Sequence, residues 1–540
     1  MKRALLLAVF VLFAVSAWAQ PDYDLVITNG RIVDGSGNPW YVADVGIRDG
    51  RIVAIGRLCG TGLQACPAKR VIDAKGLVVA PGFIDVHTHV ESGILRVPTA
   101  DNYLFDGVTS IITGNCGGSE TDLAEWFAEL REKRISINLG TLIGHNSVRR
   151  AVMGTENRDA TSDEQARMEA LVEQAMRDGA VGFSTGLIYI PGTYSKTPEV
   201  IALAHAAAKY NGLYASHMRN EETRIYAAIE EAIAVGRDAG MPVEISHFKL
   251  SSKRMWDKSD RIIAMVEKAR AEGIDVNVDQ YPYTASSTNL GVLLPSWSLA
   301  GGLDEFRKRV ADPATRKKII QEAKNDVRTD AGFKRLDYAV VAGCSWDRSL
   351  EGKSIAQINK EKGRKGKLEA ELETVIEMVE KGGAQMVYHK INERDVERIL
   401  RFPYSMVASD GGVREFGVGV PHPRSYGTNA RVLGRYVRER NVLRLEEAIR
   451  KMTSFPAQRF RLVDRGLIRP GMWADIVVFD EKTVADVATF NKPHAYSEGF
   501  AYVLVNGEVV IEGGKHTGAR PGQILLGPGA LLPTTPVAAN

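Results

Sequence analysis

Residues 82–89 read GFIDVHTH, an apolar run that ends in His87 and His89 and is typical of a buried β-strand. Side chains two apart on a strand point to the same side, so the two imidazoles converge where the run ends. Seven further apolar runs follow, each succeeded by ten or more residues of helical period. This alternation predicts βαβ units, and eight strands are the number of a closed (β/α)8 barrel. The later runs are TSIITGNCG, SINLGTLIGH, AVGFSTGL, YASHMR, VEISHFK, DVNVDQYPYT and MVASDG.

The spacing of polar residues along these runs also favours a barrel. Each residue lies near the C-terminal end of its run, where a barrel gathers catalytic side chains. An open doubly wound sheet is the alternative, and no glycine-rich phosphate loop is evident for it. Successive members of the series are 29, 39, 33, 30 and 32 residues apart, about one βα unit each: Cys116, His145, Ser184, His217, His247 and Asp279.

The next interval predicts an insertion before the last barrel strand. From Asp279 to Asp410 there are 131 residues, too many for one βα unit. We expect several helices, rich in Lys, Arg and Glu, at about residues 285–385. The barrel as a whole is predicted over residues 81–460.

Both chain ends carry short β-rich runs separated by glycine turns, such as DLVITNGRIVDG near the start and YVLVNGEVVIEGGK near the end. We expect residues 22–80 and 461–520 to pair in one small β-sandwich. Residues 521–540 are rich in Pro, Gly and Ala and carry no charged side chain. That composition predicts a flexible tail.

Residues 1–19 have the pattern of a secretory signal peptide. Lys2 and Arg3 precede an apolar run over residues 4–15, and residues 17–19 read AWA, a small-x-small cleavage pattern. The run is shorter than the roughly twenty residues that span a bilayer, so an uncleaved anchor is the less favoured alternative. No later stretch reads as a membrane span. We therefore expect an exported protein, periplasmic or secreted, with no membrane association after cleavage.

Composition narrows the range of possible partners and protein classes. The 540 residues include 69 Lys and Arg against 66 Asp and Glu, a near balance that argues against nucleic acid as a partner. Hydrophobic residues make up 44% and charged residues 25%, as in ordinary globular proteins. The four cysteines are too few for a disulfide framework. Cys59 and Cys66 could form a local disulfide in LCGTGLQAC, and Cys344 is predicted to be a buried single cysteine.

Cys116, His217 and His247 are candidate metal ligands at the ends of three different runs. Each could instead be a packed structural residue, and a lone cysteine commonly is. Taken together, one Cys and two His are ligands that tetrahedral zinc prefers. Three protein ligands leave a fourth position open for water, as in catalytic sites.

Asp410, in VASDGG after the eighth run, is a candidate general base. An Asp before two glycines could equally be a turn residue. The first and eighth strands of a barrel are neighbours, so Asp410 is expected beside His87 and His89. There its carboxylate could hydrogen-bond a metal-activated water and carry its proton.

These motifs jointly resemble one family. The sequences PGFIDVHTH, TGNCG, SHMRNE, ISHFK, DQYPYTASS, ASDG with HPRSYG, and GMWADIVVFD are similar to those of the D-aminoacylases, the N-acyl-D-amino-acid deacylases of the amidohydrolase superfamily. The resemblance implies a TIM-like metallo-dependent hydrolase barrel. Cysteine at the second strand separates this branch from hydantoinases and dihydroorotases, which tend to carry a carboxylated lysine at the fourth strand. Here the fourth run, GFSTGLIY, has no lysine.

The resemblance also implies roles for individual residues. Cys116, His217 and His247 match a tight zinc site, and His87, His89 and Asp410 match a second, weaker metal position, with the Cys116 thiolate as bridge. Four further residues could alternatively be surface or packing residues. Lys249 and Arg424 match positions suited to the substrate α-carboxylate, while Tyr189 and Tyr283 match pocket residues; His145 is a further candidate for the pocket lining.

We therefore expect zinc-dependent hydrolysis of an N-acyl-D-amino acid to a carboxylate and a free D-amino acid, with Asp410 as general base and acid. Two alternatives stay open. One is a cyclic amidase of the dihydroorotase or hydantoinase type, and the other is a non-catalytic secreted metal-binding protein.

Overall fold

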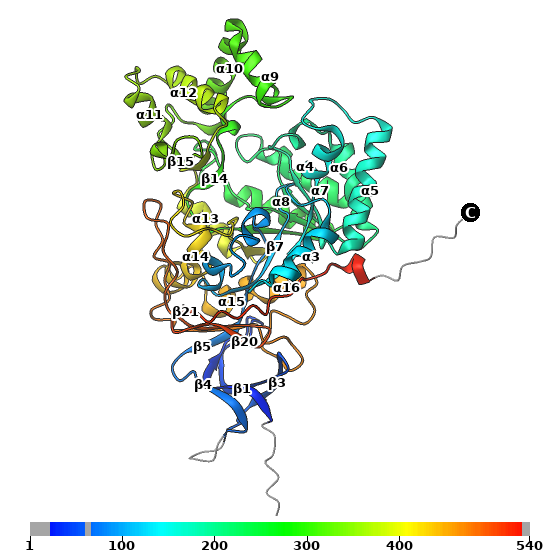
Figure 1. Ribbon diagram of the computed structural model, residues 1–540, viewed down its shortest axis with the longest axis vertical. Coiled ribbons are helices and arrows are strands. Elements are labelled where there is room, and N and C mark those ends of the chain that lie inside the picture. Colours follow the sequence, from blue (N-terminus) through cyan, green and yellow to red (C-terminus); the bar gives the residue numbers. More distant parts are fainter. Residues whose placement is uncertain (1–21, 60–65, 532–540) are drawn as a thin grey trace, which may run out of the picture.

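The computed structural model describes residues 22–59 and 66–531. The predicted signal peptide lies outside these residues. A central barrel separates two smaller parts of the molecule: strands from both chain ends lie at one end, and helices α9 to α12 lie at the other (Figure 1). This arrangement leaves one mouth of the barrel facing the α9–α12 part.

Parallel strands form the barrel in two hydrogen-bonded segments, β6-β7-β8 and β9-β10-β11-β12-β13-β17. The single residue Leu142 separates β8 from β9, so the predicted run SINLGTLIGH is one interrupted strand and the barrel has eight strand positions. This is the predicted (β/α)8 architecture. The strands are β6 (Phe83–Asp85), β7 (Val108–Thr113), β8 (Asn138–Thr141), β9 (Ile143–Gly144), β10 (Gly182–Gly186), β11 (Leu213–His217), β12 (Val243–Ile245), β13 (Val276–Gln280) and β17 (Ser405–Val407).

The barrel closes between its first and eighth strands, just beyond their regular residues. Thr88 and Gly411 form a parallel bridge. The amide of Asp410 donates to the carbonyl of His87 at 2.8 Å, and the amide of His89 donates to that of Gly411 at 2.7 Å. These bonds hold Asp410 next to both histidines of the first strand.

Helices cover the outside of the strands (Figure 1). Local sequence fixes several of their ends: Thr161 and Glu164 form a reciprocal capping box at the start of α5. The helices are α1 (Glu91–Ile94), α2 (Asp101–Leu104), α3 (Leu123–Lys133), α4 (His145–Met153), α5 (Ser162–Asp178), α6 (Thr197–Ala208), α7 (Ile225–Ala239), α8 (Ser259–Ala271), α13 (Glu393–Arg401), α14 (Arg424–Arg431), α15 (Leu445–Met452) and α16 (Ser454–Arg459).

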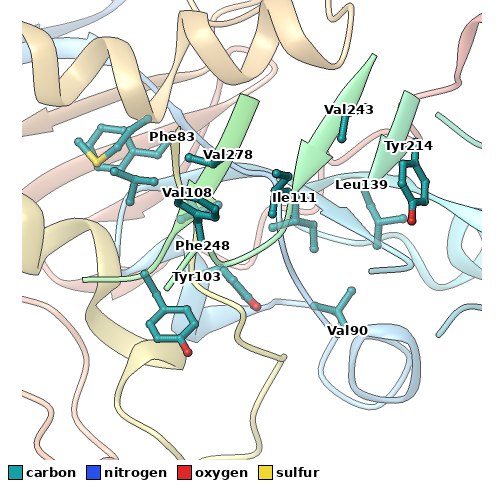
Figure 2. Close-up of a cluster of buried hydrophobic side chains, with 14 of the residues drawn as sticks. Phe83, Val90, Tyr103, Val108, Ile111, Leu139, Tyr214, Val243, Phe248 and Val278 are labelled. Atoms are coloured by element: carbon teal, nitrogen blue, oxygen red, sulfur yellow. The ribbon is translucent and has the colours of Figure 1, made fainter. Parts of the chain in front are cut away.

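The largest hydrophobic core lies between the strands and these helices. Figure 2 shows part of it, with Val108, Val243 and Val278 from three strands and Phe248 among the labelled side chains. All four side chains are fully buried. Burial of this apolar surface fixes the strands, and with them the loops at their carboxyl ends.

Strands from both chain ends share one mixed sheet of nine strands. The strand β5 pairs antiparallel with β18, with Val79 opposite Val478. The sandwich prediction needs one change, because β1 pairs with β4 over its first half and with β5 over its last residues, so a single continuous sheet forks there. The strands are β1 (Tyr23–Ile32), β2 (Tyr41–Arg48), β3 (Arg51–Gly56), β4 (Ala68–Asp73), β5 (Val78–Pro81), β18 (Ile476–Phe479), β19 (Phe500–Val505), β20 (Glu508–Glu512) and β21 (Lys515–His516).

An insertion leaves the barrel after β13. Besides the predicted helices it contains an antiparallel sheet in the order β14-β16-β15, which the sequence did not predict because polar residues fill its first strand. The insertion has a hydrophobic core of its own. Its elements are β14 (Ser286–Asn289), α9 (Leu303–Ala311), α10 (Pro313–Asn325), β15 (Ala339–Gly343), α11 (Ile355–Glu361), α12 (Leu368–Glu380) and β16 (Gln385–Tyr388).

The structure shows the state of three cysteines. Cys59 and Cys66 form a disulfide, and Cys344 is free and buried.

No helix among residues 22–59 and 66–531 is long and apolar enough to cross a membrane.

The prediction of a flexible tail is wrong for residues 521–531. The amide of Gly522 donates to the carbonyl of Ile135 at 2.9 Å, and that of Leu525 donates to Leu139 in β8 at 2.7 Å. The Leu525 side chain is buried. Glycine permits this close approach, since a Cβ at position 522 would collide with the Ile135 carbonyl. The low charge of the segment reflects packing against the barrel rather than mobility.

A chain that ends at Arg520 should therefore be less stable than the full-length protein. Losing the buried Leu525 and these hydrogen bonds should lower the free energy of unfolding by about 3 kcal/mol. Urea unfolding followed by circular dichroism measures the difference. A chain that ends at Leu531 is the matched control and should match full length; equal stability of all three proteins would show that the segment adds nothing.

Candidate metal centre

Three imidazole nitrogens surround the sulfur of Cys116 at the carboxyl end of the barrel. The Sγ atom lies 3.3 Å from His87 Nε2, 3.5 Å from His217 Nδ1 and 3.4 Å from His247 Nε2. All four residues are buried. The first strand and the ends of β11 and β12 supply the histidines, so residues more than 100 positions apart meet at one sulfur atom.

The backbone is constrained at this point of convergence. Cys116, His247 and Asp410 have φ angles of 53°, 37° and 51°, in the left-handed region that non-glycine residues seldom adopt. Gly117 follows at φ 75°, and a Cβ there would collide with the side chain of Asn146. Such conformations persist when the surroundings enforce them, and they are common at functional sites.

A second group of donor atoms lies beside the first. His89 Nε2 is 3.1 Å from Asp410 Oδ1, and His87 Nε2 is 3.8 Å from the same oxygen. His87 is shared, because it also contacts Cys116. The structure thus brings together all six residues that the sequence suggested for two metal positions.

Carboxylates behind the histidines fix their orientation. Asp279 Oδ2 lies 3.3 Å from His87 Nδ1, and its Oδ1 accepts the backbone N–H of His247 at 2.7 Å. Glu221 Oε1 lies 3.0 Å from His247 Nδ1. A carboxylate that accepts one ring N–H leaves the other nitrogen free to bind a metal, an arrangement usual around ligating histidines.

The electrostatics of the centre suit a bound cation. Burial raises the pKa of the Cys116 thiol well above its usual range. Burial also lowers the pKa of both His217 and His247, so their rings are neutral donors. Burial alone would raise the pKa of Asp410, but the Arg424 guanidinium and the hydrogen bond from His89 hold it well below its usual range. A metal ion would stabilise the thiolate that burial otherwise disfavours.

The spacing of the donors fits tetrahedral zinc. Bonds of about 2.3 Å to sulfur and about 2.0 Å to nitrogen place sulfur and nitrogen about 3.5 Å apart in a tetrahedron. The distances from Cys116 Sγ to His217 and His247 are 3.5 and 3.4 Å. These residues are therefore able to hold a zinc ion.

Two cations flank the centre, each paired with a carboxylate. Lys249 Nζ lies 2.5 Å from Glu221 Oε1, and Arg424 Nη1 lies 2.8 Å from Asp410 Oδ2. Both side chains are buried. The two residues suggested for the substrate carboxylate thus lie beside the donor atoms. Ion pairs with Glu221 and Asp410 hold them there.

Of the two tyrosines suggested by sequence, the structure places one at the centre. The Tyr189 ring centroid lies 4.7 Å from that of His217, and its hydroxyl accepts from Thr288 at 3.1 Å. The interpretation of Tyr283 as a pocket residue needs correction, because its ring packs against His422 and lies below the Arg431 guanidinium.

Tyr281 occupies the place expected of Tyr283. Its ring centroid lies 5.6 Å from Lys249 Nζ and 4.7 Å from Arg424 Cζ, so the ring is near both cations. Its buried hydroxyl has no hydrogen-bond partner among the described residues. The free hydroxyl is available to a ligand that the two cations attract.

His145, suggested as a pocket residue, belongs to a separate buried cluster. Its Nε2 lies 2.8 Å from Glu199 Oε1, and Arg149 pairs with the same carboxylate. This cluster ties α4 to α6 and does not contact Cys116. His422 accepts the backbone N–H of Arg424 at 3.0 Å and so shapes the loop that carries this arginine.

Sequence reasoning missed three residues of the centre: Glu221, Asp279 and Tyr281. Glu221 follows His217 by four residues, a spacing that could have signalled an orienting carboxylate. Asp279 appeared only as a member of the spacing series. Tyr281 carried no signal that distinguished it from Tyr283 in DQYPYTASS.

Comparisons with known proteins identify the family of this chain. A model of the amidohydrolase family matches residues 70–511, and a model of the urease alpha-subunit N-terminal domain matches residues 14–74. The chain is 37% identical to the N-acyl-D-glutamate deacylase of Alcaligenes xylosoxydans xylosoxydans, covering 94% of this chain and 97% of that protein. It is 36% identical to the D-aminoacylase of the same organism, covering 94% and 98%.

Solved structures give the same result. The N-acyl-D-glutamate deacylase of Bordetella bronchiseptica, complexed with zinc and a phosphonate inhibitor, superposes with a TM-score of 0.79 at 35% identity, covering 93% of this chain and 99% of that one. A D-aminoacylase studied for its binuclear metal centre superposes with a TM-score of 0.79 at 33% identity, covering 94% and 100%. The chain belongs to the amidohydrolase family and, within it, to the D-aminoacylases and N-acyl-D-amino-acid deacylases.

Proposed function

We propose that this protein hydrolyses the amide bond of N-acyl-D-amino acids with a zinc ion held by Cys116, His217 and His247. The observation that carries the proposal is the sulfur–nitrogen spacing of these donors, which fits tetrahedral zinc, beside the Asp410 carboxylate. The names of the similar deacylases support the substrate class, and the zinc-bound Bordetella bronchiseptica structure supports the metal.

A second metal position is proposed at His87, His89 and Asp410. His87 Nε2 lies 3.3 Å from Cys116 Sγ, so this sulfur could bridge two ions. The fourth strand, β10, reads GFSTG and offers no lysine as an alternative bridge. The binuclear centre of the similar D-aminoacylase supports this second position.

When bound, zinc polarises the scissile carbonyl and lowers the pKa of a water molecule to about 7. Asp410 takes the proton of the attacking water and returns it to the amide nitrogen as the C–N bond breaks. Arg424 keeps Asp410 ionised, so the carboxylate is ready to accept that proton. The products are a carboxylate and a D-amino acid.

Three side chains are proposed to hold the α-carboxylate of the substrate: Lys249, Arg424 and Tyr281. Both cations lie within 6 Å of the Tyr281 ring, and the tyrosine hydroxyl has no hydrogen-bond partner in the part of the chain that the structure describes. A guanidinium offers a carboxylate two parallel hydrogen bonds. If the α-carboxylate is held on one side of the metal, only one configuration at the α-carbon places the amide bond next to the metal. We therefore expect selectivity for D-amino acids.

We also propose that the protein is exported, on the strength of the charged start, short apolar run and AWA sequence of residues 1–19. The N-terminal sequence of protein recovered from the periplasm should begin near Gln20. A protein that retains Met1 and stays in the cytoplasm would contradict export.

A panel of N-acetyl amino acids of both configurations tests the function. Zinc-loaded protein should hydrolyse the D-forms and lose this activity when a chelator strips the metal. Hydantoins in the same panel identify a cyclic amidase, since ring opening alone consumes them. Preference for the L-forms, or for hydantoins, would contradict the proposal.

Replacing the proposed base should remove turnover and spare the metal. Asp410→Asn keeps the shape of the side chain but cannot accept the proton, so kcat should fall by about 10²–10⁴-fold. The variant should keep the zinc ion at the cysteine site. Mass spectrometry of the purified protein measures its zinc content. Asp304→Asn, at a carboxylate whose side chain is 88% exposed on the insertion, is the control. Near-normal activity of Asp410→Asn would rule out this base.

Replacing the proposed sulfur ligand should weaken metal retention. Cys116→Ala removes the atom that contacts three histidines, so zinc should be lost on dialysis against a weak chelator that leaves the native protein loaded. Cys344→Ala is the matched control, because Cys344 is also free and buried but lies in the insertion. Equal zinc content in both variants would remove the thiolate from the ligand set.

A further inference from the structure

A cavity of about 900 Å³ lies between the insertion and two loops at the carboxyl end of the barrel. Its lining includes Ser287 of β14, Arg96 between α1 and α2, and Arg414 in the loop after β17. Figure 1 shows the insertion at this end of the molecule. The volume is in the upper part of the range of about 300–1,000 Å³ usual for small-molecule sites.

The cavity shares a wall with the proposed active site. Ser287 and His422 line the cavity, and both contact Arg424: its Nη2 donates to the Ser287 carbonyl at 3.3 Å, and its amide donates to His422 Nδ1 at 3.0 Å. Arg424 in turn pairs with Asp410. A substrate held by Arg424 could therefore extend into this cavity.

Three arginines from three separate segments line the cavity: Arg96, Arg348 and Arg414. Among the described residues, no carboxylate oxygen lies within 4.0 Å of any of these guanidinium groups. Arg414 Nε has a long hydrogen bond of 3.4 Å to the hydroxyl of Ser425. The arginines at this cavity thus differ from Arg424, which is paired with Asp410.

The lining has an excess of positive charge. Glu351 is the acidic residue in it, and its Oε1 accepts the backbone N–H of Cys344 at 3.1 Å. Burial lowers the pKa of His422 well below its usual range, so this ring adds no charge. Three guanidinium groups and one carboxylate line this cavity, so its potential is positive and would attract an anion.

We propose that this cavity binds a second carboxylate of the substrate, distinct from the α-carboxylate. This inference rests on the proposed deacylase function. The second carboxylate could come from the side chain of an acidic D-amino acid or from a dicarboxylic acyl group, and either would meet the same guanidinium groups. Apolar lining residues such as Leu290 and Leu299 would contact the methylene groups between the two charges.

Matched pairs of substrates test the proposal. N-acetyl-D-glutamate against N-acetyl-D-glutamine isolates a charge on the side chain, and N-succinyl-D-alanine against N-succinamoyl-D-alanine isolates a charge on the acyl group. In zinc-loaded protein, kcat/KM should be at least tenfold higher for the anionic member of one pair. The pair that shows this preference identifies the source of the carboxylate.

Variants assign the preference to the arginines. Arg96→Met, Arg348→Met and Arg414→Met should each lower kcat/KM for the anionic substrate by about tenfold and for its neutral partner by less than twofold. Arg131→Met is the control, because Arg131 is exposed on α3, away from the cavity, and has no ion pair among the described residues.

The outcomes separate the two proposals. Hydrolysis of the neutral substrates with no preference for either anionic member would overturn the second carboxylate and leave the deacylase function intact. Equal losses on both members of a pair in the arginine variants would also overturn it, since they indicate a structural role. Absence of turnover on every substrate would overturn the deacylase function, and this inference with it.

Discussion

The sulfur of a buried thiol lies within 3.5 Å of three imidazole nitrogens, and the other donors of the centre are arranged around it. Without a cation, burial disfavours the thiolate, and the neutral rings offer the sulfur little stabilisation. With a cation, every one of these donors gains a partner. The left-handed backbone at Cys116, His247 and Asp410 is consistent with this reading, because strain at three residues of one site needs a compensating interaction.

Two carboxylates behind the metal donors, those of Asp279 and Glu221, hold this arrangement in place. Asp279 at the end of β13 contacts both the His87 ring and the His247 backbone, so one carboxylate links two neighbouring parts of the centre. Glu221 joins His247 to Lys249 in the same way. The metal donors and the proposed carboxylate anchor are therefore coupled, and a change in Glu221 would disturb both.

The residues at strand ends were predictable from sequence because a parallel barrel brings the carboxyl ends of its strands together. The order of the strands was enough to predict that three of them lie together: Cys116, His217 and His247. Tyr281 and Tyr283 needed more: the amide of Tyr283 donates to the carbonyl of Tyr281 at 3.0 Å, a tight bend directly after β13. The alternation of side chains along the strand ends at this bend. The sequence pattern therefore could not predict which tyrosine lies near Lys249 and Arg424.

Substrate preference cannot be predicted from the pattern of the strands. The arginines of the cavity come from a loop after the first strand, a loop after the eighth and the insertion, and no periodicity relates these segments. Their convergence depends on how the insertion packs above the barrel, where β14 brings its Ser287 carbonyl to Arg424. A family of barrels can thus keep one metal centre while its loops and insertion change which acyl amino acid fits. For this chain we propose that residues at the strand ends carry the chemistry and that the insertion and loops select the substrate.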